Sequence, residues 1–391
     1  MRIEFAWRRV TVILVLVAFL TGCGMGGVSS AGEVDVWIGT TTPKDGLSKG
    51  IYHATFNTEK GKLTKPRLAA EIVNPGFVIL HPGGNVLYST GALDGKPVLA
   101  AFQIDRQNGR PTLSLKNSQP TGDGGACHLA TDRTGKTLMS VQYFNGSVAV
   151  FPLDDDGSIR RRMQLIKHEG ATGEAGSRQD RPHPHWIGTS PDNRFVFVPD
   201  LGLDRVVVYG LDAERVVLSP RGFGRSPAGA GPRHMKFHPG GKFIYLLNEM
   251  GVSVTTFAYD ADKGSLAPLQ TIRTISPEER AKETFVTASE IRVHPSGQFV
   301  YAANRRHDTI TALRVNPEDG KLSVIECEPV RGSWPRNFNV DPTGKWLLAA
   351  GRDSNSIAIF AIDQDTGELT FTGASTLTPT PICVTFGPEG N

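Results

Sequence analysis

Apolar and polar residues follow one another along most of this chain in short segments typical of β-strands. Residues 243–247 (FIYLL) and 299–303 (FVYAA) each follow a tight turn, and further apolar segments come later at 253–257 and 356–360. Most of the turns have Pro at the second position, which presets the backbone, and Gly or Asn near the end, which tolerates positive φ. The pattern predicts an all-β protein with short connections.

One turn formula, His/Asp/Ser-Pro-x-Gly with small variations, occurs seven times, and its copies begin 51, 58, 48, 56, 47 and 46 positions apart. An apolar strand precedes each turn, two more follow it, and a Gly-x-Leu turn leads to a fourth. Four strands per unit of about 50 residues indicate a blade of a β-propeller. Seven copies therefore predict seven blades of four antiparallel strands. The copies begin at His81, Asp132, Ser190, His238, His294, Asp341 and Gly387.

The last copy stops just after its turn, and the N-terminal segment supplies the strands that it lacks. Residues 34–40 are expected to form a second strand, residues 50–56 a third, and residues 61–63 lead into a fourth. We predict one composite blade, closed by N- and C-terminal strands, because this pairing hides the edges of an open array. Residues 34–391 would then be a single propeller domain. A β-helix would have shorter repeats, and two sandwiches would not repeat one turn formula seven times.

Residues 1–22 have the features of a lipoprotein signal peptide. Three arginines precede an apolar run at 10–20, which is too short to span a bilayer. The sequence LTGC that ends at Cys23 resembles a bacterial lipobox, in which the cysteine is lipidated and becomes the first mature residue. We expect a flexible tether over 23–33 and a mature protein anchored to a membrane in the periplasm or cell envelope. A plain signal peptide or a short anchor are alternatives, and without the lipobox the protein would be cytoplasmic.

Composition and charge exclude other classes of protein. With 39% hydrophobic and 21% charged residues, the chain is not disordered in bulk. Its net charge is +3, and loss of Arg2, Glu4, Arg8 and Arg9 with the signal peptide would leave +1. A nearly neutral chain without a basic run lacks the electrostatic footprint of a nucleic-acid-binding protein. We therefore expect no nucleic-acid partner, and we expect a monomer.

The repeat brings residues of different blades to one end of a central tunnel. Residues that lie at the same distance from the start of each turn copy form a row. The first row lies five positions before each turn, where the inner strand enters the hub. The second row lies one position further on. The third row lies eleven positions after the start of each turn, where the second strand has returned to the same end. In chain order, the rows are Gly76, Cys127, His185, Arg233, Ser289 and Arg336; Phe77, His128, Trp186, His234, Glu290 and Asn337; and Ala92, Tyr143, Leu201, Glu249, Arg305 and Arg352.

Arginines, histidines and carboxylates gathered in otherwise apolar strands indicate a functional site, because a buried charge is costly without a partner or a ligand. Arg233 and Arg305, together with Arg336 and Arg352, are suited to clamp a phosphate or a carboxylate. Inter-blade ion pairs are the alternative for each arginine taken singly. The convergence of several arginines favours an anionic ligand.

His185 and Glu249 are the candidate acid–base residues. His185 is suited to transfer a proton near neutral pH, and Glu249 to orient His185, to act as a base on water or to pair with an arginine. With the arginines they offer what ester hydrolysis needs: an activated water, a stabilised oxyanion and a grip on the substrate, with no metal or cofactor. The candidate substrate-binding residues are His128, His183, His234, Glu290, Arg336, Asn337 and Arg352.

Two other chemistries have weaker support. No serine lies in a Gly-x-Ser-x-Gly elbow, so a serine-hydrolase mechanism is unsupported. His183 and His185 alternate on one strand and are a candidate metal pair, but no third ligand is apparent. Cys127 and Cys383 both fall near the hub, where the alternatives are buried thiols and a disulfide.

The two longest steps of the repeat contain insertions at 168–181 and 276–287. The first insertion carries Arg178 shortly before His183, and the second is rich in charged residues. Long connections between blades are natural rims or lids of a site, although solvated surface loops are the alternative.

Several motifs are distinctive as a set: IGT at 38–40, KGIY at 49–52, RPHPH at 181–185, DLGLDR at 200–205, GPRH at 231–234, NE at 248–249, NRRHD at 304–308 and PRNF at 335–338. Over residues 34–386 they resemble the bacterial 6-phosphogluconolactonase family of seven-bladed propellers. The resemblance implies hydrolysis of an anionic sugar lactone, 6-phosphogluconolactone, in the pentose phosphate pathway. It also implies kinship with fungal carboxy-muconate lactonizing enzymes, where a His, two Arg and a Glu form the active-site set. The matching residues here are His185, Arg233, Glu249 and Arg305.

The expected export of the chain conflicts with a cytosolic phosphosugar substrate. Two functions outside lactone hydrolysis therefore stay open. One is a non-catalytic propeller that binds a partner or a carbohydrate at the membrane surface. The other is a lactonizing enzyme or cycloisomerase that acts on a dicarboxylate with the same arginines.

Overall fold

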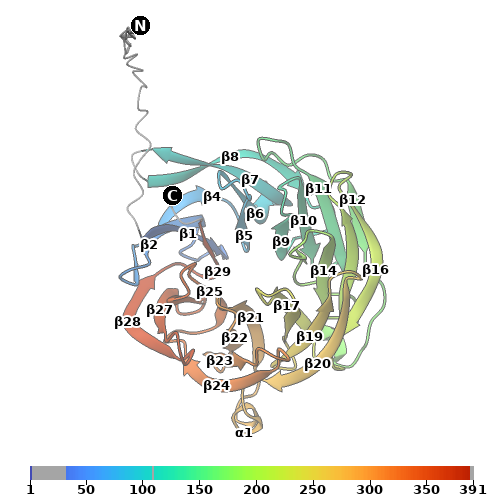
Figure 1. Cartoon of the computed structure of the whole chain (residues 1–391). Coiled ribbons are helices and arrows are strands. Elements are labelled where there is room, and N and C mark those ends of the chain that lie inside the picture. Colours follow the sequence, from blue (N-terminus) through green and yellow to red (C-terminus); the bar gives the residue numbers. More distant parts are fainter. Residues whose placement is uncertain (2–31, 108–109, 388–391) are drawn as a thin grey trace.

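The computed structural model describes Met1, residues 32–107 and residues 110–387, and its strands form seven antiparallel sheets arranged in a ring (Figure 1). The predicted seven-bladed β-propeller is confirmed. The expected signal peptide at 1–22 (apart from Met1), nearly all of the tether and the end of the last turn copy lie outside the described residues.

Each blade has four positions, counted from the tunnel outward. The innermost strands are β29 (Pro381–Phe386), β5 (Val78–Leu80), β9 (His128–Thr131), β13 (Gly188–Thr189), β17 (Pro232–Phe237), β21 (Thr287–Val293) and β25 (Pro335–Val340). The second strands are β1 (Glu33–Thr40), β6 (Val86–Leu93), β10 (Thr137–Gln142), β14 (Phe195–Asp200), β18 (Phe243–Asn248), β22 (Phe299–Arg305) and β26 (Trp346–Gly351).

The two outer positions complete the blades. The third strands are β2 (Gly50–Asn57), β7 (Lys96–Gln107), β11 (Ser147–Pro152), β15 (Arg205–Asp212), β19 (Ser253–Asp260), β23 (Thr309–Val315) and β27 (Ser356–Ile362). The outermost strands are β3 (Lys62–Leu63) with β4 (Arg67–Glu71), β8 (Arg110–Pro120), β12 (Gln164–Lys167), β16 (Val217–Arg225), β20 (Ser265–Arg273), β24 (Leu322–Pro329) and β28 (Leu369–Leu377).

One blade is composite, as the sequence predicts. β29 pairs with β1, with Val384 opposite Ile38, and β1 pairs in turn with β2. The fourth position of this blade is divided between β3 and β4, which both pair with β2. The two ends of the chain thus close the ring through backbone hydrogen bonds, which leaves no open blade edge at the seam.

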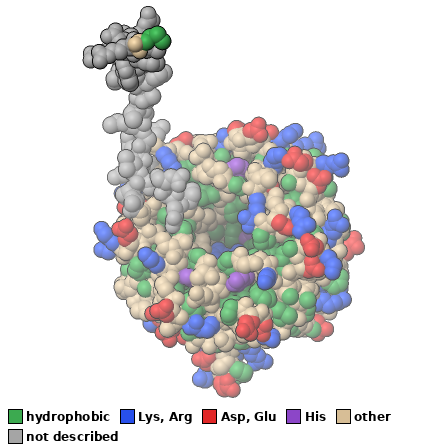
Figure 2. Space-filling model, viewed as in Figure 1, with side chains coloured by type: hydrophobic (Ala, Val, Ile, Leu, Met, Phe, Trp, Pro, Cys, Tyr) green, Lys and Arg blue, Asp and Glu red, His purple; other side chains and the backbone are tan. Residues whose placement is uncertain are grey.

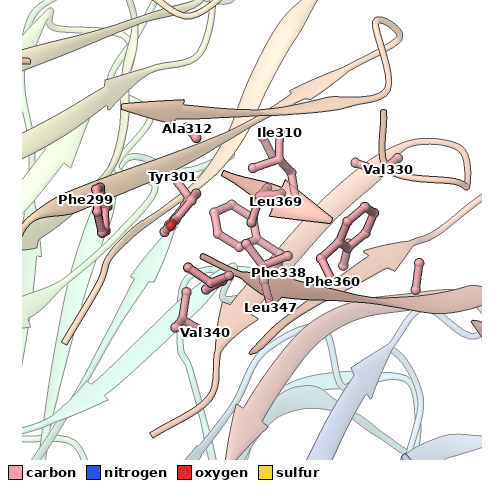
Figure 3. Close-up of a cluster of buried hydrophobic side chains, with 14 residues drawn as sticks. Phe299, Tyr301, Ile310, Ala312, Val330, Phe338, Val340, Leu347, Phe360 and Leu369 are labelled. Atoms are coloured by element: carbon pink, nitrogen blue, oxygen red, sulfur yellow. The ribbon is translucent and has the colours of Figure 1, made fainter. Parts of the chain in front are cut away.

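The core consists of separate hydrophobic clusters between neighbouring blades. Strands β10 and β14 are buried along their whole length, whereas the outermost β20 is mostly exposed. In the cluster shown in Figure 3, Tyr301 of one blade packs with Phe338 and Phe360 of the next. Each sheet buries both faces of its inner strands, which explains why these strands have mostly apolar sequences.

The repeated turn also links each blade to the next one. His238 Nε2 donates a hydrogen bond of 3.0 Å to the carbonyl oxygen of Gly297 in the following copy of the turn, and His81 and His294 make the same contact with Gly135 and Gly344. A tyrosine hydroxyl forms a second link of this kind, donating to a glycine carbonyl of the next blade. The tyrosine–glycine pairs are Tyr88–Gly157, Tyr245–Gly320 and Tyr301–Gly367.

The two insertions form short helical segments. The first contains the 3-10 turn η1 (Gly176–Arg178), and the second contains α1 (Pro277–Ala281), which projects beyond the ring (Figure 1). Cys127, Cys327 and Cys383 are free thiols, so the alternative of a disulfide in the hub is wrong. Within the described ranges, no helix is long and apolar enough to cross a membrane.

Candidate active site

The inner strands begin at one end of the tunnel, called here the entry end, and run to the repeated turns at the turn end. A cavity of about 220 Å³, the entry cavity, lies at the entry end, and Figure 2 shows the hollowed centre of one face of the ring. Its lining includes Gly76, Phe77, Cys127, His185, Arg233, His234, Arg336 and Asn337. Five of the six residues of the first row and three of the six of the second row therefore line one cavity.

Glu249 lies beside this cavity and is the centre of a cluster of three arginines. Its Oε2 accepts a hydrogen bond from Arg233 Nε at 2.9 Å, and its Oε1 lies 2.6 Å from Arg178 Nη2 and 3.1 Å from Arg305 Nη2. Burial alone would raise the pKa of Glu249, but the charges of Arg305 and Arg178 hold it below its usual value. Glu249 is thus an ionised carboxylate whose lone pairs are occupied by arginines.

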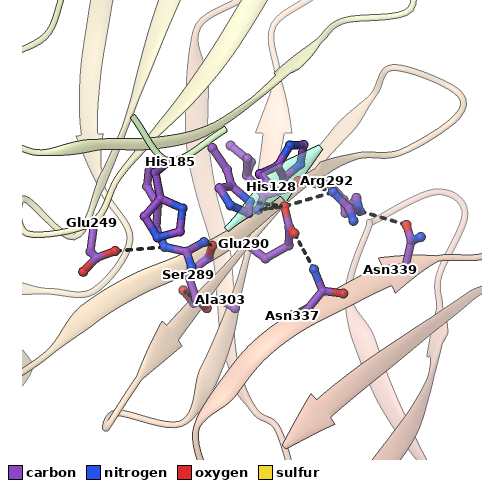
Figure 4. A network of polar contacts seen from close by, with 12 residues as sticks. His128, His185, Glu249, Ser289, Glu290, Arg292, Ala303, Asn337 and Asn339 are labelled. Carbon is purple, nitrogen blue, oxygen red and sulfur yellow. Dashed lines mark hydrogen bonds and ion pairs between the residues drawn. The ribbon is translucent and has the colours of Figure 1, made fainter. Parts of the chain in front are cut away.

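Arg233 is among the largest side chains that are fully buried in the protein. Besides its contact with Glu249, its Nη1 donates to the backbone carbonyl of Ser289 (Figure 4). These two contacts fix the plane of the guanidinium, and the side chain lines the entry cavity. Arg305 supports the same carboxylate from the other side, where it also donates to the Ala288 carbonyl at 3.0 Å.

His185 is a buried histidine in the wall of the entry cavity. Burial lowers its pKa well below the usual value, and the neighbouring His234, whose ring centroid is 5.4 Å away, acts in the same direction. Its Nδ1 is buried with no hydrogen-bond partner in the described part of the chain. A neutral imidazole with an unoccupied ring nitrogen is able to accept a proton from a water molecule in the cavity.

Arg336 supplies the unpaired positive charge of the entry cavity. Its guanidinium forms no hydrogen bond or ion pair with any residue that the structure describes. Burial lowers the pKa of Arg336 to about 10, and the charges of Arg352 and Arg178 add to the shift. A partly buried cation without a partner is stabilised by an anion, so Arg336 is suited to bind a phosphate or a carboxylate.

A second buried carboxylate, Glu290, contacts Asn337 in the wall of the entry cavity (Figure 4). Its side chain is fully buried, and it accepts hydrogen bonds from Asn337 Nδ2 and from Arg292 Nη1, the latter at 2.9 Å. His234 Nδ1 lies 3.1 Å from the same carboxylate. Glu290 and its partners thus form a hydrogen-bonded network behind the wall of the entry cavity.

Three further predicted site residues neither line the entry cavity nor hydrogen-bond to Glu249 or Glu290. His128 is buried one layer deeper, with its ring centroid 4.1 Å from that of Phe77. His183 stacks on Tyr143 at 4.4 Å, and one of its ring nitrogens hydrogen-bonds to the Tyr143 carbonyl. Arg352 is at the rim, paired with the adjacent Asp353.

Two residues of the site were not predicted as site residues. Arg178 comes from the first insertion and reaches the Glu249 cluster, where Tyr143 accepts a hydrogen bond of 3.2 Å from it. Tyr143 belongs to the third row, so the row count could have identified it. Arg178 lies outside the repeat, and the one signal for it was the length of the insertion.

The site carries no obvious cation-binding group. The rings of His183 and His185 both face Tyr143, but no set of three or more His, Cys, Asp or Glu side chains among the described residues could hold a metal ion. The side chains that line the entry cavity include those of His185 and His234 and the guanidinium groups of Arg233 and Arg336.

Comparisons with known proteins give the family. Residues 35–386 match the model of the family described as "Lactonase, 7-bladed beta-propeller". The 6-phosphogluconolactonase of Bacillus subtilis is 35% identical over 350 residues, which cover 90% of this chain and 97% of the relative. The 6-phosphogluconolactonase of Formosa agariphila is 33% identical over 341 residues, which cover 85% of this chain and 94% of the relative.

The solved structure of a periplasmic gluconolactonase from Pseudomonas aeruginosa superposes with a TM-score of 0.83 at 28% identity, covering 92% of this chain and all of the other. The chain therefore belongs to the family of seven-bladed β-propeller lactonases.

Proposed function

We propose that the protein hydrolyses a sugar lactone that carries an anionic group, with 6-phosphogluconolactone as the model substrate. The observation that supports this most is that a neutral His185, the fixed guanidinium of Arg233 and the unpaired guanidinium of Arg336 all line one small cavity. These three groups correspond to a base, an oxyanion donor and an anion-binding group.

In the proposed mechanism, His185 takes a proton from a water molecule as the water oxygen attacks the lactone carbonyl carbon. Negative charge then develops on the carbonyl oxygen, where Arg233 stabilises it. The bond between the carbonyl carbon and the ring oxygen breaks, and the ring oxygen takes the proton from His185. The products are a free hydroxyl group and a carboxylic acid, which releases its proton to the solvent and becomes a carboxylate, and the histidine returns to its neutral state.

Glu249 has a positioning role in this mechanism. Its two oxygens are taken up by Arg178, Arg233 and Arg305, so it is not free to activate water itself. It fixes the orientation of Arg233, and its negative charge favours the protonated form of His185 that arises during the reaction.

A second candidate substrate is the lactone without a phosphate group. The lipobox-like sequence before Cys23 favours it, because phosphorylated sugars are cytosolic, and the Pseudomonas relative is described as a periplasmic gluconolactonase. We propose that the mature protein is exported and lipid-anchored through Cys23. Labelling with palmitate should mark the wild-type chain and not Cys23→Ala, and absence of label from both would exclude the anchor.

An assay with the two lactones tests the proposed activity and separates the two substrates. The purified protein is mixed with gluconolactone or 6-phosphogluconolactone, and acid release is followed after subtraction of spontaneous hydrolysis. If Arg336 binds the phosphate, Arg336→Met should lose about tenfold in kcat/KM on the phosphorylated lactone and little on the other. Hydrolysis of neither lactone above background would contradict the proposed function.

A further inference from the structure

A second, larger cavity lies at the turn end of the tunnel. Its volume is about 430 Å³, and residues from all seven innermost strands line it. Seven of these residues lie two positions before a copy of the repeated turn, so they form a further row. In chain order they are Ile79, Ala130, Gly188, Lys236, Arg292, Asn339 and Thr385. This space is called here the turn cavity.

Lys236 and Arg292 bring two positive charges into the turn cavity. Arg292 is partly compensated, because it donates to Glu290 at 2.9 Å and to Asn339 Oδ1 at 2.8 Å (Figure 4). Lys236 Nζ lies over the Trp186 ring, 5.1 Å from its centroid, and makes no hydrogen bond or ion pair with the residues that the structure describes. The cavity therefore has one more positive charge than its carboxylate balances.

The surroundings of Lys236 disfavour the charged form of its side chain. Burial lowers the pKa of the Lys236 ammonium to about 7, and the charge of Arg292 adds to the shift against the weaker effects of Glu290 and Cys383. The histidines His128 and His234 are neutral for the same reasons of burial and nearby positive charge. An anion beside Lys236 would raise the pKa of its ammonium group and so favour the charged form.

The rest of the lining is suited to an organic ligand rather than to a bare ion. Phe77, Ile187 and Phe237 present apolar surface, and the buried indole nitrogen of Trp186 has no hydrogen-bond partner in the described residues. The volume is within the range of small-molecule sites, about 300 to 1,000 Å³. Three threonines add hydroxyl groups to the wall: Thr131, Thr189 and Thr385.

We propose that the turn cavity is a second ligand-binding site, which holds a small organic anion with an apolar ring between Lys236 and Arg292. The anionic group, a carboxylate or a phosphate, binds the two cations, and the ring packs against Trp186 and Phe77. Glu290 and its partners separate this site from the entry cavity, since Asn337 lines the entry cavity and Arg292 lines the turn cavity. The two sites thus bind anions through different charged residues, and Phe77 lines both cavities.

Calorimetric titration with phenyl phosphate tests this site. The protein is the purified full chain with Arg336→Met, which removes the unpaired cation of the entry cavity. We expect one phenyl phosphate to bind, and Lys236→Met in the same background to weaken binding about tenfold or more. Lys236→Arg keeps the charge and should retain binding. Lys263→Met, which removes an exposed lysine, should change nothing.

Three results would overturn the proposal. The first is that Lys236→Met, made in the Arg336→Met protein, leaves the affinity for phenyl phosphate unchanged. The second is that phenyl phosphate does not bind to the Arg336→Met protein. The third is that inorganic phosphate binds as tightly as phenyl phosphate. Neutral benzyl alcohol is the control for the ring alone and should bind far more weakly. Circular dichroism spectra of the variants establish that each one is folded.

Discussion

Arg178 Nη2 lies 2.6 Å from Glu249 Oε1, although Arg178 belongs to a connection between two blades and Glu249 follows the second strand of a later blade. Arg178 also donates a hydrogen bond to the Tyr143 hydroxyl. The first insertion is therefore attached to the carboxylate that positions Arg233. This contact makes the inter-blade segment part of the candidate site.

Replacement of Arg178 tests this role. Arg178→Gln removes one of three guanidinium groups from Glu249, and a hydrogen bond to a charged group contributes about 1.5–3 kcal/mol. Because the Arg178 side chain is 38% exposed, we expect the lower end of this range, a loss of about tenfold in kcat/KM. Arg181→Gln, which breaks an exposed pair with Asp180, is the matched control and should retain activity. Equal activity of both variants would mean that the contact does not support the site.

Glu249→Gln should destabilise the protein as well as inactivate it. The change leaves the buried Arg233 and Arg305 without their carboxylate, and breaking a buried ion pair costs about 3–5 kcal/mol. Denaturant unfolding measures this loss. The control is Glu328→Gln, which breaks the partly exposed pair with Arg331 and should cost less than about 1 kcal/mol. A similar, small loss in both variants would argue against a tightly coupled cluster.

The protein should lose stability as the pH falls below about 6.5, the pKa of a free histidine. Burial holds the pKa of His128, His185 and His234 well below that value in the folded state. The unfolded chain therefore binds protons that the folded protein does not, and each such histidine contributes a slope of about 1.4 kcal/mol per pH unit. This stability is fully present above pH 6.5 and declines below it.

Urea unfolding at pH 7.5, 6.5 and 5.5 measures this slope. His128→Phe is the informative variant, because His128 already packs between the rings of Phe77 and Trp186. Its slope between pH 6.5 and 5.5 should be smaller by about 1 kcal/mol per pH unit, because the free histidine is only partly protonated in this range. An unchanged slope would show that His128 is protonated in the folded protein.

The tyrosine links between blades should contribute to stability and not to activity. Tyr301→Phe leaves the Gly367 carbonyl without its 3.0 Å donor, and an unsatisfied buried acceptor costs about 1–3 kcal/mol. Tyr259→Phe is a close control, since the Tyr259 hydroxyl is buried with no partner among the described residues, and its removal should cost less than about 0.5 kcal/mol. Equal losses would contradict a role for these links.

The repeat made much of the fold and site predictable from the sequence. Counting from the turns placed His185, Arg233 and Arg336 around one cavity, because strand direction and turn position fix where each inner strand begins. The same count, carried to two positions before each turn, would have identified Lys236 and Arg292. The composite blade was predictable for a related reason: the missing strands of the last repeat are present at the N-terminus.

Other parts of the site depend on contacts that a repeat does not encode. Arg178 lies in an insertion, whose path is set by packing against later blades. Arg352 has the expected position in its row, but the adjacent Asp353 holds its guanidinium at the rim. His128 is one residue further along its strand than Cys127, and this is enough to move it from the entry cavity to the turn cavity.

His185 is the proposed base of a lactone-hydrolysing cavity. The most direct test is the rate of acid release from 6-phosphogluconolactone and gluconolactone by His185→Gln and by the unchanged protein, with folding checked by circular dichroism. We expect His185→Gln to hydrolyse the better of the two substrates at least about 100-fold more slowly than the unchanged protein does. Equal rates for a folded His185→Gln protein would contradict it.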